Sequence, residues 1–417
     1  MVHTLKYVAA KTYTRLNRNR IAIMRILFVE ICNYVDYPLG GQLSFAKHLT
    51  RAMGGGIDLV GCTTDMNEPL RKWTTKEIEG YKYNIFNICY EKNTTEKPFV
   101  PRRITTYYYI RKYHHLIDFS KYDCVMYQAP EVMLALPKDV LRKSCLVMPG
   151  VGNALQISRY KWARSFASLY DKVFFSRAQY CKCILAAADT EAIKCFANRS
   201  KGKVEAKNVL QFPTRYDAAI FNKKDKAALR TKYGISNGTT IFVTTGRLNW
   251  FKGWELMIDA FKLYISSTNN QDTQLIFIGD GEERERITTY INDNSLQDKV
   301  FLLGRKSLDV VSEYLSLSDE FIMGSFAEGW STSLVEAVAS GLPCVVTNFS
   351  SSKEMVKDDY NGYVIENRDV DQFAKRMADA LSLNKECIDE ACTNCQRLSV
   401  QRMKDELLSL IRPYYPA

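Results

Sequence analysis

The sequence is poor in histidine and acidic residues, and it contains no long uninterrupted apolar run. Only 4 of its 417 residues are histidine, which leaves little material for chemistry based on clustered imidazoles. The best apolar segment, Ile21 to Cys32, is interrupted by Arg25 and Glu30 and is too short to cross a bilayer. The sequence therefore predicts neither a histidine-rich metal centre nor a transmembrane helix.

The cysteines do not form the pattern of a disulfide framework or a zinc site, although there are 12 of them. Only Cys392 and Cys395 have C-x-x-C spacing, and no second pair or histidine lies near them. Others lie in apolar, strand-like runs, where cysteine behaves as a small hydrophobe: Cys89, Cys124, Cys145 and Cys344. We expect no bound metal, and the simplest expected environment is a reducing cytoplasm.

The shortage of acidic residues leaves a formal net charge of +11, from 57 Lys and Arg against 46 Asp and Glu. Such an excess favours an anionic partner: nucleotide phosphates, a lipid diphosphate, a membrane surface or nucleic acid. Residues 1–24 are basic and contain no acidic residue, which fits either a membrane-facing helix or a poorly structured extension. Residues 102–112 form a second basic stretch, rich in tyrosine.

Alternating strand-like and helix-like segments run through the whole chain and predict two α/β domains with mostly parallel sheets. The first group of expected strands lies at 25–31, 57–62, 83–89, 123–127, 144–148, 172–176 and 183–187. Helices are expected at 42–53, 103–117, 162–170, 308–317, 331–340, 370–383 and 386–411. The expected division is a basic extension (1–24), a first Rossmann-like domain (25–204), a second (205–398) and a C-terminal helix (399–417) that packs back toward the first.

Residues 321–348 form the most informative stretch, because they read as strand, loop, helix and strand. Ligands of such βαβ units sit outside the carboxyl ends of the strands. Glu328 in the loop and Glu336 in the helix are therefore candidates for contacts with a hydroxyl-rich, phosphate-bearing ligand. The alternative is structural: Ser333 and Glu336 fit the S-x-x-E capping box, and Glu328 can be an exposed loop carboxylate.

Three segments occur in order in the second half: FVTTGRLNWFKGWELMIDAF, LIFIGDGEERERI and SFAEGWSTSLVEAVASGLPCVV. Together they closely resemble the nucleotide-sugar-binding half of GT-B glycosyltransferases, specifically the retaining family four with its E-x7-E signature. Glu328 and Glu336 have that spacing. The resemblance is strong over residues 205–383 and weaker, though collinear, in the first half.

The resemblance implies roles for individual residues. Arg247 and Lys252 match the pair that binds the donor diphosphate, Glu328 the carboxylate beside the donor sugar, and Glu336 the residue that binds the ribose hydroxyls. It implies no resident metal and no cofactor beyond a UDP-, GDP- or ADP-sugar donor. The other positions that it places at the donor are Gly40, Gly41, Gly246, Gly329, Ser331, Thr332 and Ser333.

Two positions depart from the family pattern. Many relatives carry a His after the strand equivalent to residues 144–148, where this sequence has Met148-Pro149-Gly150. The usual Asn-Gly-Val-Asp turn is replaced by Thr214-Arg215-Tyr216-Asp217. In this family the leaving phosphate is thought to accept the proton of the acceptor hydroxyl, so the missing His bears on sugar contacts more than on activity.

The sequence thus predicts a retaining hexosyltransferase that acts on a glycan or lipid-linked saccharide, in polysaccharide or glycolipid synthesis. The expected location is the cytoplasm, with an anionic surface at the inner face of the membrane as a candidate partner. A GT-B epimerase or sugar phosphorylase is the alternative, although no dedicated phosphate or cofactor-lysine site is recognisable. A nucleic-acid-binding protein is a remote alternative, because no recognition motif accompanies the charge.

Overall fold

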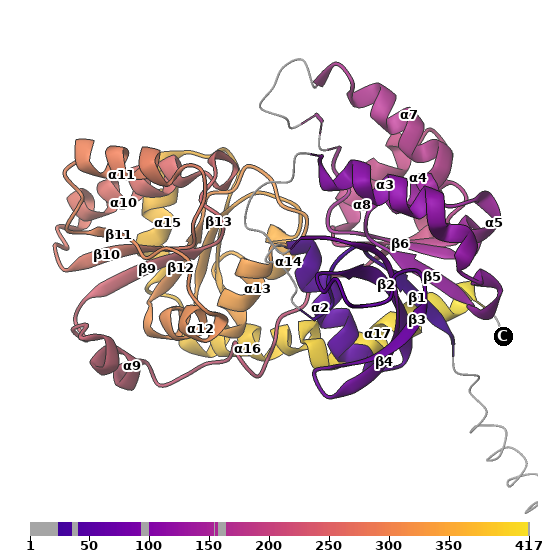
Figure 1. Ribbon diagram of the computed structural model, residues 1–417. Coiled ribbons are helices and arrows are strands. Elements are labelled where there is room, and N and C mark those ends of the chain that lie inside the picture. The colour runs from indigo at the N-terminus through magenta and orange to yellow at the C-terminus, as the bar shows by residue number, and fades with distance from the viewer. Residues whose placement is uncertain (1–23, 36–40, 93–99, 154, 157–163, 416–417) are drawn as a thin grey trace, which may run out of the picture.

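The computed structural model describes residues 24–35, 41–92, 100–153, 155–156 and 164–415. The described chain forms two α/β lobes that lie side by side, the first indigo to magenta and the second orange in Figure 1. Residues 1–23 and Gly40 lie outside the described part, and so do the expectations that fall on them.

The first lobe contains a sheet of strand order β3-β4-β2-β1-β5-β6-β7-β8. All pairs are parallel except β3 with β4. Its strands are β1 (Ile26–Val29), β2 (Ile57–Thr63), β3 (Trp73–Ile78), β4 (Tyr81–Tyr90), β5 (Cys124–Tyr127), β6 (Ser144–Met148), β7 (Cys183–Ala186) and β8 (Val209–Gln211). Its helices are α2 (Gly41–Met53), α3 (Arg102–Tyr113), α4 (Pro130–Ala135), α5 (Lys138–Leu141), α7 (Ala167–Ala178) and α8 (Thr190–Arg199).

The second lobe is built on an all-parallel sheet of order β11-β10-β9-β12-β13-β14. Its strands are β9 (Thr240–Thr245), β10 (Thr273–Ile278), β11 (Val300–Leu302), β12 (Glu320–Met323), β13 (Cys344–Thr347) and β14 (Gly362–Ile365). Its helices are α9 (Lys226–Tyr233), α10 (Trp254–Thr268), α11 (Arg284–Asp293), α12 (Leu308–Leu317), α13 (Thr332–Ala339), α14 (Ser352–Met355), α15 (Val370–Ala380) and α16 (Lys385–Cys395).

Both sheets are covered on both faces, which explains why their strands are continuous apolar runs. In β1, Leu27 and Val29 belong to one core cluster, whereas Ile26 and Phe28 belong to the cluster on the opposite face. The second sheet is arranged in the same way. Each sheet therefore lies in the middle of its lobe, with both faces covered. Only the ends of its strands are accessible to a ligand.

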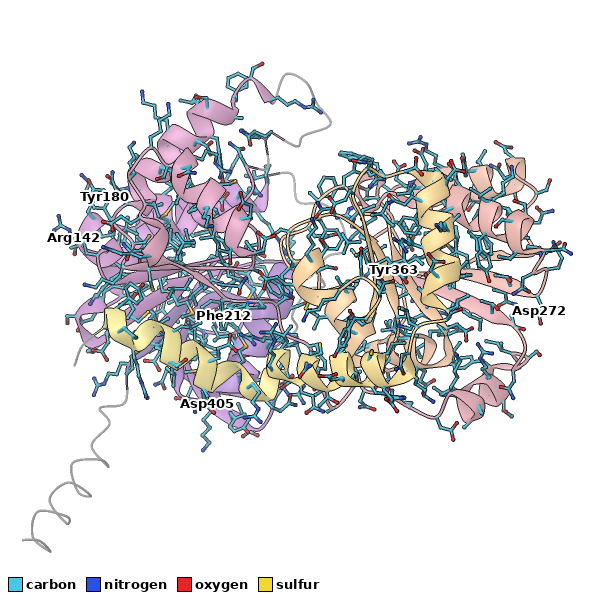
Figure 2. All side chains as sticks on the ribbon, turned by 180° about the vertical axis from the view of Figure 1, so that it is seen from behind. Arg142, Tyr180, Phe212, Asp272, Tyr363 and Asp405 are labelled. Atoms are coloured by element: carbon cyan, nitrogen blue, oxygen red, sulfur yellow. The ribbon has the colours of Figure 1, made fainter. Side chains whose placement is uncertain are left out.

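The last helix, α17 (Val400–Ile411), returns to the first lobe and packs against α2. Figure 2 shows it crossing the back of the first lobe, past Phe212. The chain passes between the lobes twice, and the two connecting segments run side by side. The backbone N–H of Tyr216 donates to the carbonyl oxygen of Leu398 at 3.2 Å, and that of Val400 donates to the carbonyl oxygen of Tyr216 at 3.0 Å.

Four local expectations are corrected by the structure. Residues 172–176 belong to helix α7, because their apolar residues follow a helical spacing across its buried side. The antiparallel edge strand β3 was not expected, since its outer face is polar and exposed. The expected helix at 386–411 is divided into α16 and α17 by a 3₁₀ turn at Gln396–Leu398. Strand β8 pairs with β7, so the first sheet extends beyond the expected boundary at residue 204.

No helix within the described residues has the length and apolar character that a membrane crossing needs.

Candidate active site

Three loops meet at the carboxyl ends of the central strands of the second sheet. They follow β9, β10 and β12 and cover residues 246–253, 279–283 and 324–331. The chain adds β10 and β11 on one side of β9, and then crosses over to add β12, β13 and β14 on the other side. Ligands of doubly wound sheets bind at such a topological switch point. The fold therefore brings together the loops that contain Arg247, Lys252 and Glu328.

Two glycines allow these loops to approach one another closely. At Gly253, φ is +63° and an added Cβ would lie 1.8 Å from the carbonyl oxygen of Gly324. At Gly279, φ is +148° and an added Cβ would lie 1.8 Å from the carbonyl oxygen of Gly246. Any side chain at either position would push the loops apart. These contacts hold the three loops as one surface.

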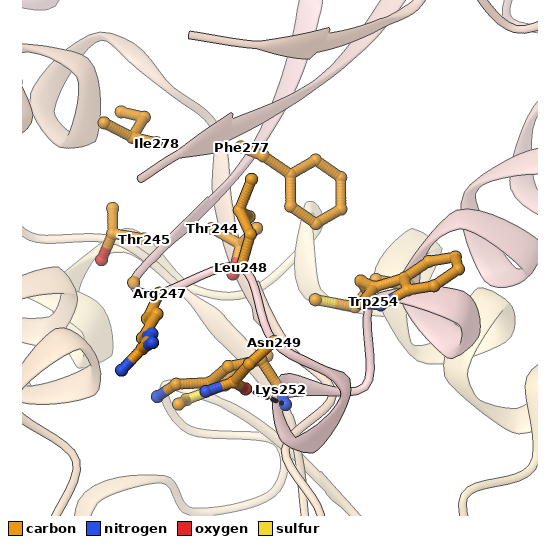
Figure 3. A pocket seen from close by; sticks show the side chains of 12 residues that line it. Thr244, Thr245, Arg247, Leu248, Asn249, Lys252, Trp254, Phe277 and Ile278 are labelled. Atoms are coloured by element: carbon orange, nitrogen blue, oxygen red, sulfur yellow. Dashed lines mark hydrogen bonds between the residues drawn. The ribbon is translucent and has the colours of Figure 1, made fainter. Parts of the chain in front are cut away.

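Lys252 ends a short 3₁₀ turn, η4 (Trp250–Lys252), that is capped by Asn249. The backbone N–H of Lys252 donates to Oδ1 of Asn249 at 3.1 Å (Figure 3). The ammonium nitrogen Nζ lies 2.6 Å from Oε1 of Glu328, and the hydroxyl of Ser325 donates to the same oxygen at 2.9 Å. The side chains of Lys252 and Glu328 are 24% and 19% exposed. The loops therefore hold a largely buried ion pair at the switch point.

Arg247 lies on the same loop as Lys252 (Figure 3). Its side chain is 67% exposed. Its guanidinium lies 3.1 Å from Oε2 of Glu282, a carboxylate that is 50% exposed. Such a solvated pair contributes about 0–1 kcal/mol. Beside it is an open groove of about 680 Å³, lined in part by Arg247, Asp280, Arg305 and Lys306.

Helix α13 begins next to this loop and is capped by Ser331. The Ser331 hydroxyl accepts a hydrogen bond from the backbone N–H of Leu334 at 3.4 Å and is itself buried. Ser333 Oγ would lie 3.9 Å from a Cβ added to Gly246, so the first turn of the helix faces the loop after β9. The positive end of α13, with Thr332 and Ser333 in its first turn, is therefore directed toward the loop that contains Lys252.

Glu336 does not cap this helix, and the capping-box interpretation is wrong. The cap residue is Ser331 and its third helical position is Leu334, so Glu336 lies in the second turn. The Glu336 side chain is half-buried, and its carboxyl group has no hydrogen-bond or ion-pair partner among the described residues. Burial raises the pKa of Glu336 to about 8. An unpaired carboxyl group on the helix that faces the candidate phosphate site is free to bind ligand hydroxyls.

The first lobe reaches this site through backbone at Pro149 and Gly150. A Cβ added to Gly329 would lie 2.0 Å from the carbonyl oxygen of Pro149, 2.9 Å from that of Ala187 and 2.9 Å from Cα of Gly150. Gly329 therefore packs directly against the two loops that follow β6 and β7. Because Gly329 adjoins Glu328, the first lobe places a backbone carbonyl, not an imidazole, close to that carboxylate.

The remaining expected positions are distributed as follows. Gly41 begins helix α2, and Gly40 lies outside the described residues. Trp330, the neighbour of Gly329, is 3% exposed and packs in the core of the second lobe. Reasoning from the sequence missed Ser325, Glu282 and Lys306. The adjacent cations Arg305 and Lys306, directly after the apolar run of β11, are the signal that could have indicated this groove.

The described residues contain no group of three or more His, Cys, Asp or Glu that could hold a metal ion. All 12 cysteines are free thiols.

Two Rossmann-like lobes that face each other, with a ligand-competent switch point in the second, define the GT-B fold class. Comparison with solved structures agrees. Sucrose-phosphate synthase from Thermosynechococcus elongatus superimposes with a TM-score of 0.73 and 16% identity, covering 94% of this chain and 98% of that one. Anabaena Alr3699/HepE, solved in complex with UDP and glucose, superimposes with a TM-score of 0.65 and 14% identity, covering 93% and 99%.

Residues 225–395 match the family model described as glycosyl transferases group 1. The matched residues cover most of the second lobe, from the beginning of α9 to the end of α16. Among curated proteins, the UDP-Gal:alpha-D-GlcNAc-diphosphoundecaprenol alpha-1,3-galactosyltransferase of Escherichia coli is 27% identical over 244 residues, which is 55% of this chain and 62% of that enzyme. The aligned region thus spans less than two thirds of the relative's length.

Proposed function

We propose that this protein is a retaining glycosyltransferase that moves a hexose from a nucleotide diphosphate sugar to a hydroxyl group of a glycan or lipid-linked saccharide. One observation carries the proposal. A cationic pair, Arg247 and Lys252, lies at the switch point of the second sheet together with the ion-paired Glu328 and the partnerless Glu336. A nucleotide sugar presents hydroxyls, two phosphates and a sugar, which are the groups that these side chains can bind.

The donor phosphates would lie between the loop after β9 and the beginning of α13. As the bond between the anomeric carbon and the phosphate oxygen breaks, negative charge develops on the leaving diphosphate. Lys252 and Arg247 stabilise that charge, and the amides of the first turn of α13 add their dipole. The weak contact between Arg247 and Glu282 allows the guanidinium to exchange a carboxylate for a phosphate.

Glu328 would contact the donor sugar, because it is the carboxylate held next to Lys252 and next to the approach of the first lobe. Its charge stabilises the cationic character that develops at the anomeric carbon. The acceptor oxygen forms its bond on the face that the phosphate leaves, and its proton passes to the departing phosphate oxygen. Glu336 would accept hydrogen bonds from the ribose hydroxyls.

The first lobe would bind the acceptor, and helices α3 and α7 would bring it to an anionic membrane surface. Exposed Ile104, Tyr107 and Tyr108 on α3 and exposed Leu169 and Val173 on α7 form what we call the basic-apolar surface. Both helices pack against α4 on the same side of the lobe (Figure 1). Helix α3 contains four Arg or Lys and no acidic residue. Apolar side chains flanked by cations suit an interface with anionic lipid.

Thermal-shift and calorimetric titrations of the full chain with UDP-, GDP- and ADP-sugars test the donor site. One nucleotide is expected to stabilise the protein, and Arg247→Ala and Glu336→Ala are each expected to abolish that shift. Lys262→Ala, an exposed change on helix α10, is the matched control and is expected to leave the shift unchanged. If no nucleotide binds the intact protein, the proposal is wrong.

A further inference from the structure

A second topological switch point lies in the first lobe, between β1 and β5. Strand β1 pairs with β2 on one side and with β5 on the other, and both pairs are parallel. Val29 and Tyr127, the last residues of β1 and β5, lie opposite one another in register. The residues that follow them, Glu30 and Gln128, therefore emerge side by side at the carboxyl edge of the sheet. Crevices at such positions are where doubly wound sheets bind ligands.

Glu30 is buried at this edge with an unsatisfied carboxyl oxygen. The residue is 8% exposed, and Oε2 has no hydrogen-bond partner. Gln128 donates to the carboxyl group from both its backbone and its side-chain amide, so the orientation of the group is fixed. A buried polar atom without a partner destabilises the folded protein. A ligand hydroxyl that donated to Oε2 would remove that cost.

The surroundings of Glu30 carry further groups that suit a hydroxyl-rich ligand. Glu131, in the first turn of α4, is close enough to raise the pKa of Glu30, although burial is the larger cause, and the resulting value is about 7. Glu131 also lies 3.6 Å from the guanidinium of Arg103. Carboxyl and amide groups of this kind bind sugar hydroxyls in both donor and acceptor roles.

The same edge leads directly to the candidate active site. Along the sheet the order is β1, β5, β6 and β7, and the loops after β6 and β7 pack on Gly329, next to Glu328. Neighbouring strands are about 4.8 Å apart, so β1 lies about 10 Å from β6. That separation is close to the length of a disaccharide. A hydroxyl bound at Glu30 is therefore too far from Glu328 to be the reacting one.

We infer that Glu30 and Gln128 form an acceptor subsite that binds a hydroxyl of the sugar unit one position removed from the reacting unit. This inference rests on the proposed function. Glu30 binds the sugar and Gln128 orients the carboxyl group, and neither touches the reacting atoms. The protein is consequently selective for acceptors of at least two sugar units.

The test compares acceptors of two lengths with the nucleotide hexose that stabilises the protein as donor. Transfer to p-nitrophenyl monosaccharides and p-nitrophenyl disaccharides is measured for the wild-type chain, Glu30→Gln and Gln128→Leu, together with slow hydrolysis of the donor without acceptor. The wild-type chain is expected to have the lower KM for a disaccharide. Glu30→Gln is expected to raise that KM about 10- to 100-fold and to leave the monosaccharide KM and donor hydrolysis unchanged.

Glu320→Gln is the matched control. Glu320 is likewise a buried glutamate with unpartnered carboxyl oxygens, but it begins β12 and so lies at the amino ends of the strands of the second sheet. Its substitution is expected to change neither KM. The inference is overturned if the wild-type chain does not prefer disaccharides, or if Glu30→Gln affects both acceptors equally, as a purely structural role would. Loss of nucleotide binding and hydrolysis in the wild-type chain would instead refute the proposed function.

Discussion

Lys252 and Glu328 form an ion pair of 2.6 Å that joins the loop after β9 to the loop after β12. Both groups are assigned to the same donor, one to its diphosphate and one to its sugar. The pair places the two functions side by side, at the position where the bond between sugar and phosphate would lie. It also keeps each charge compensated before the donor arrives, which lowers the cost of holding two partly buried charges.

Replacing Glu328 with Gln is expected to preserve nucleotide binding and to abolish transfer. The amide keeps the shape of the side chain but loses the charge that would stabilise the anomeric carbon. By analogy with other electrostatic groups in active sites, kcat is expected to fall about 10²- to 10³-fold. Calorimetry with the nucleotide and initial-rate measurements check the two parts separately. Unchanged turnover would remove Glu328 from its assigned role.

Replacing Arg247 with Ala is expected to weaken binding of the nucleoside diphosphate about tenfold or more and to leave binding of the nucleoside nearly unchanged. The reason is that the guanidinium contacts only phosphate in the proposed complex. Glu282→Ala is the informative control, because it releases Arg247 from its carboxylate partner and is expected to tighten diphosphate binding slightly. Equal losses for nucleoside and diphosphate would contradict the assignment.

Nucleotide-sugar binding is expected to strengthen as pH rises, because ribose hydroxyls donate to the ionised form of Glu336. Its pKa of about 8 means that most of the carboxyl groups are protonated at pH 7. Affinity is therefore expected to rise roughly tenfold between pH 7 and pH 8.5 and then to level off. Calorimetry with a nucleotide sugar, whose diphosphate does not titrate in this range, measures the slope. A flat profile would show that Glu336 is not a ligand.

Stability provides an independent check on Glu336. Its folded-state pKa lies above the ordinary 4.5, so ionisation opposes folding, and this destabilisation grows as pH rises from 4.5 toward 8. Glu336→Gln removes the titrating group and is expected to raise the melting temperature of the free protein at pH 8. A capping residue would behave in the opposite way, because its replacement costs about 0.5–2 kcal/mol. A lowered melting temperature would instead show that the Glu336 carboxylate makes a stabilising contact in the free protein.

The sequence predicted the helices and strands best where apolar periodicity and glycine spacing coincide. It predicted them least well where contacts between distant parts of the chain determine the structure. Helix α12 lies where its pattern predicted, at 308–317, because apolar residues recur along it at helical spacing. The pattern at 172–176 was misread because five apolar and polar residues fit a strand as well as a helix. The S-x-x-E pattern indicated Ser333 as the cap of α13, whereas Ser331 caps it in the structure, and this difference removes Glu336 from the capping position. The contact between Gly329 and Pro149 joins residues 180 positions apart, so no local pattern encodes it.

The basic-apolar surface is expected to bind vesicles that contain phosphatidylglycerol and to bind vesicles of pure phosphatidylcholine weakly. Replacing Leu169 and Val173 together with Ser removes two exposed apolar side chains and is expected to reduce binding at least tenfold. Met66→Ser, at another exposed apolar position of the same lobe, is the control. Cosedimentation at low and high salt measures the effect. Equal binding by the double variant and the control would exclude this surface.

Replacing Gly329 with Ala is expected to impair transfer and to leave nucleotide binding intact. The new Cβ would lie 2.0 Å from the carbonyl oxygen of Pro149, so the lobes must separate to accommodate it. The cations and carboxylates assigned to the donor are all on the second lobe, whereas transfer requires the acceptor carried by the first. Gly152→Ala is the matched control in the facing loop, because no atom lies within 4 Å of its added Cβ. An equal kcat for both variants would show that this contact between the lobes does not set the distance between donor and acceptor.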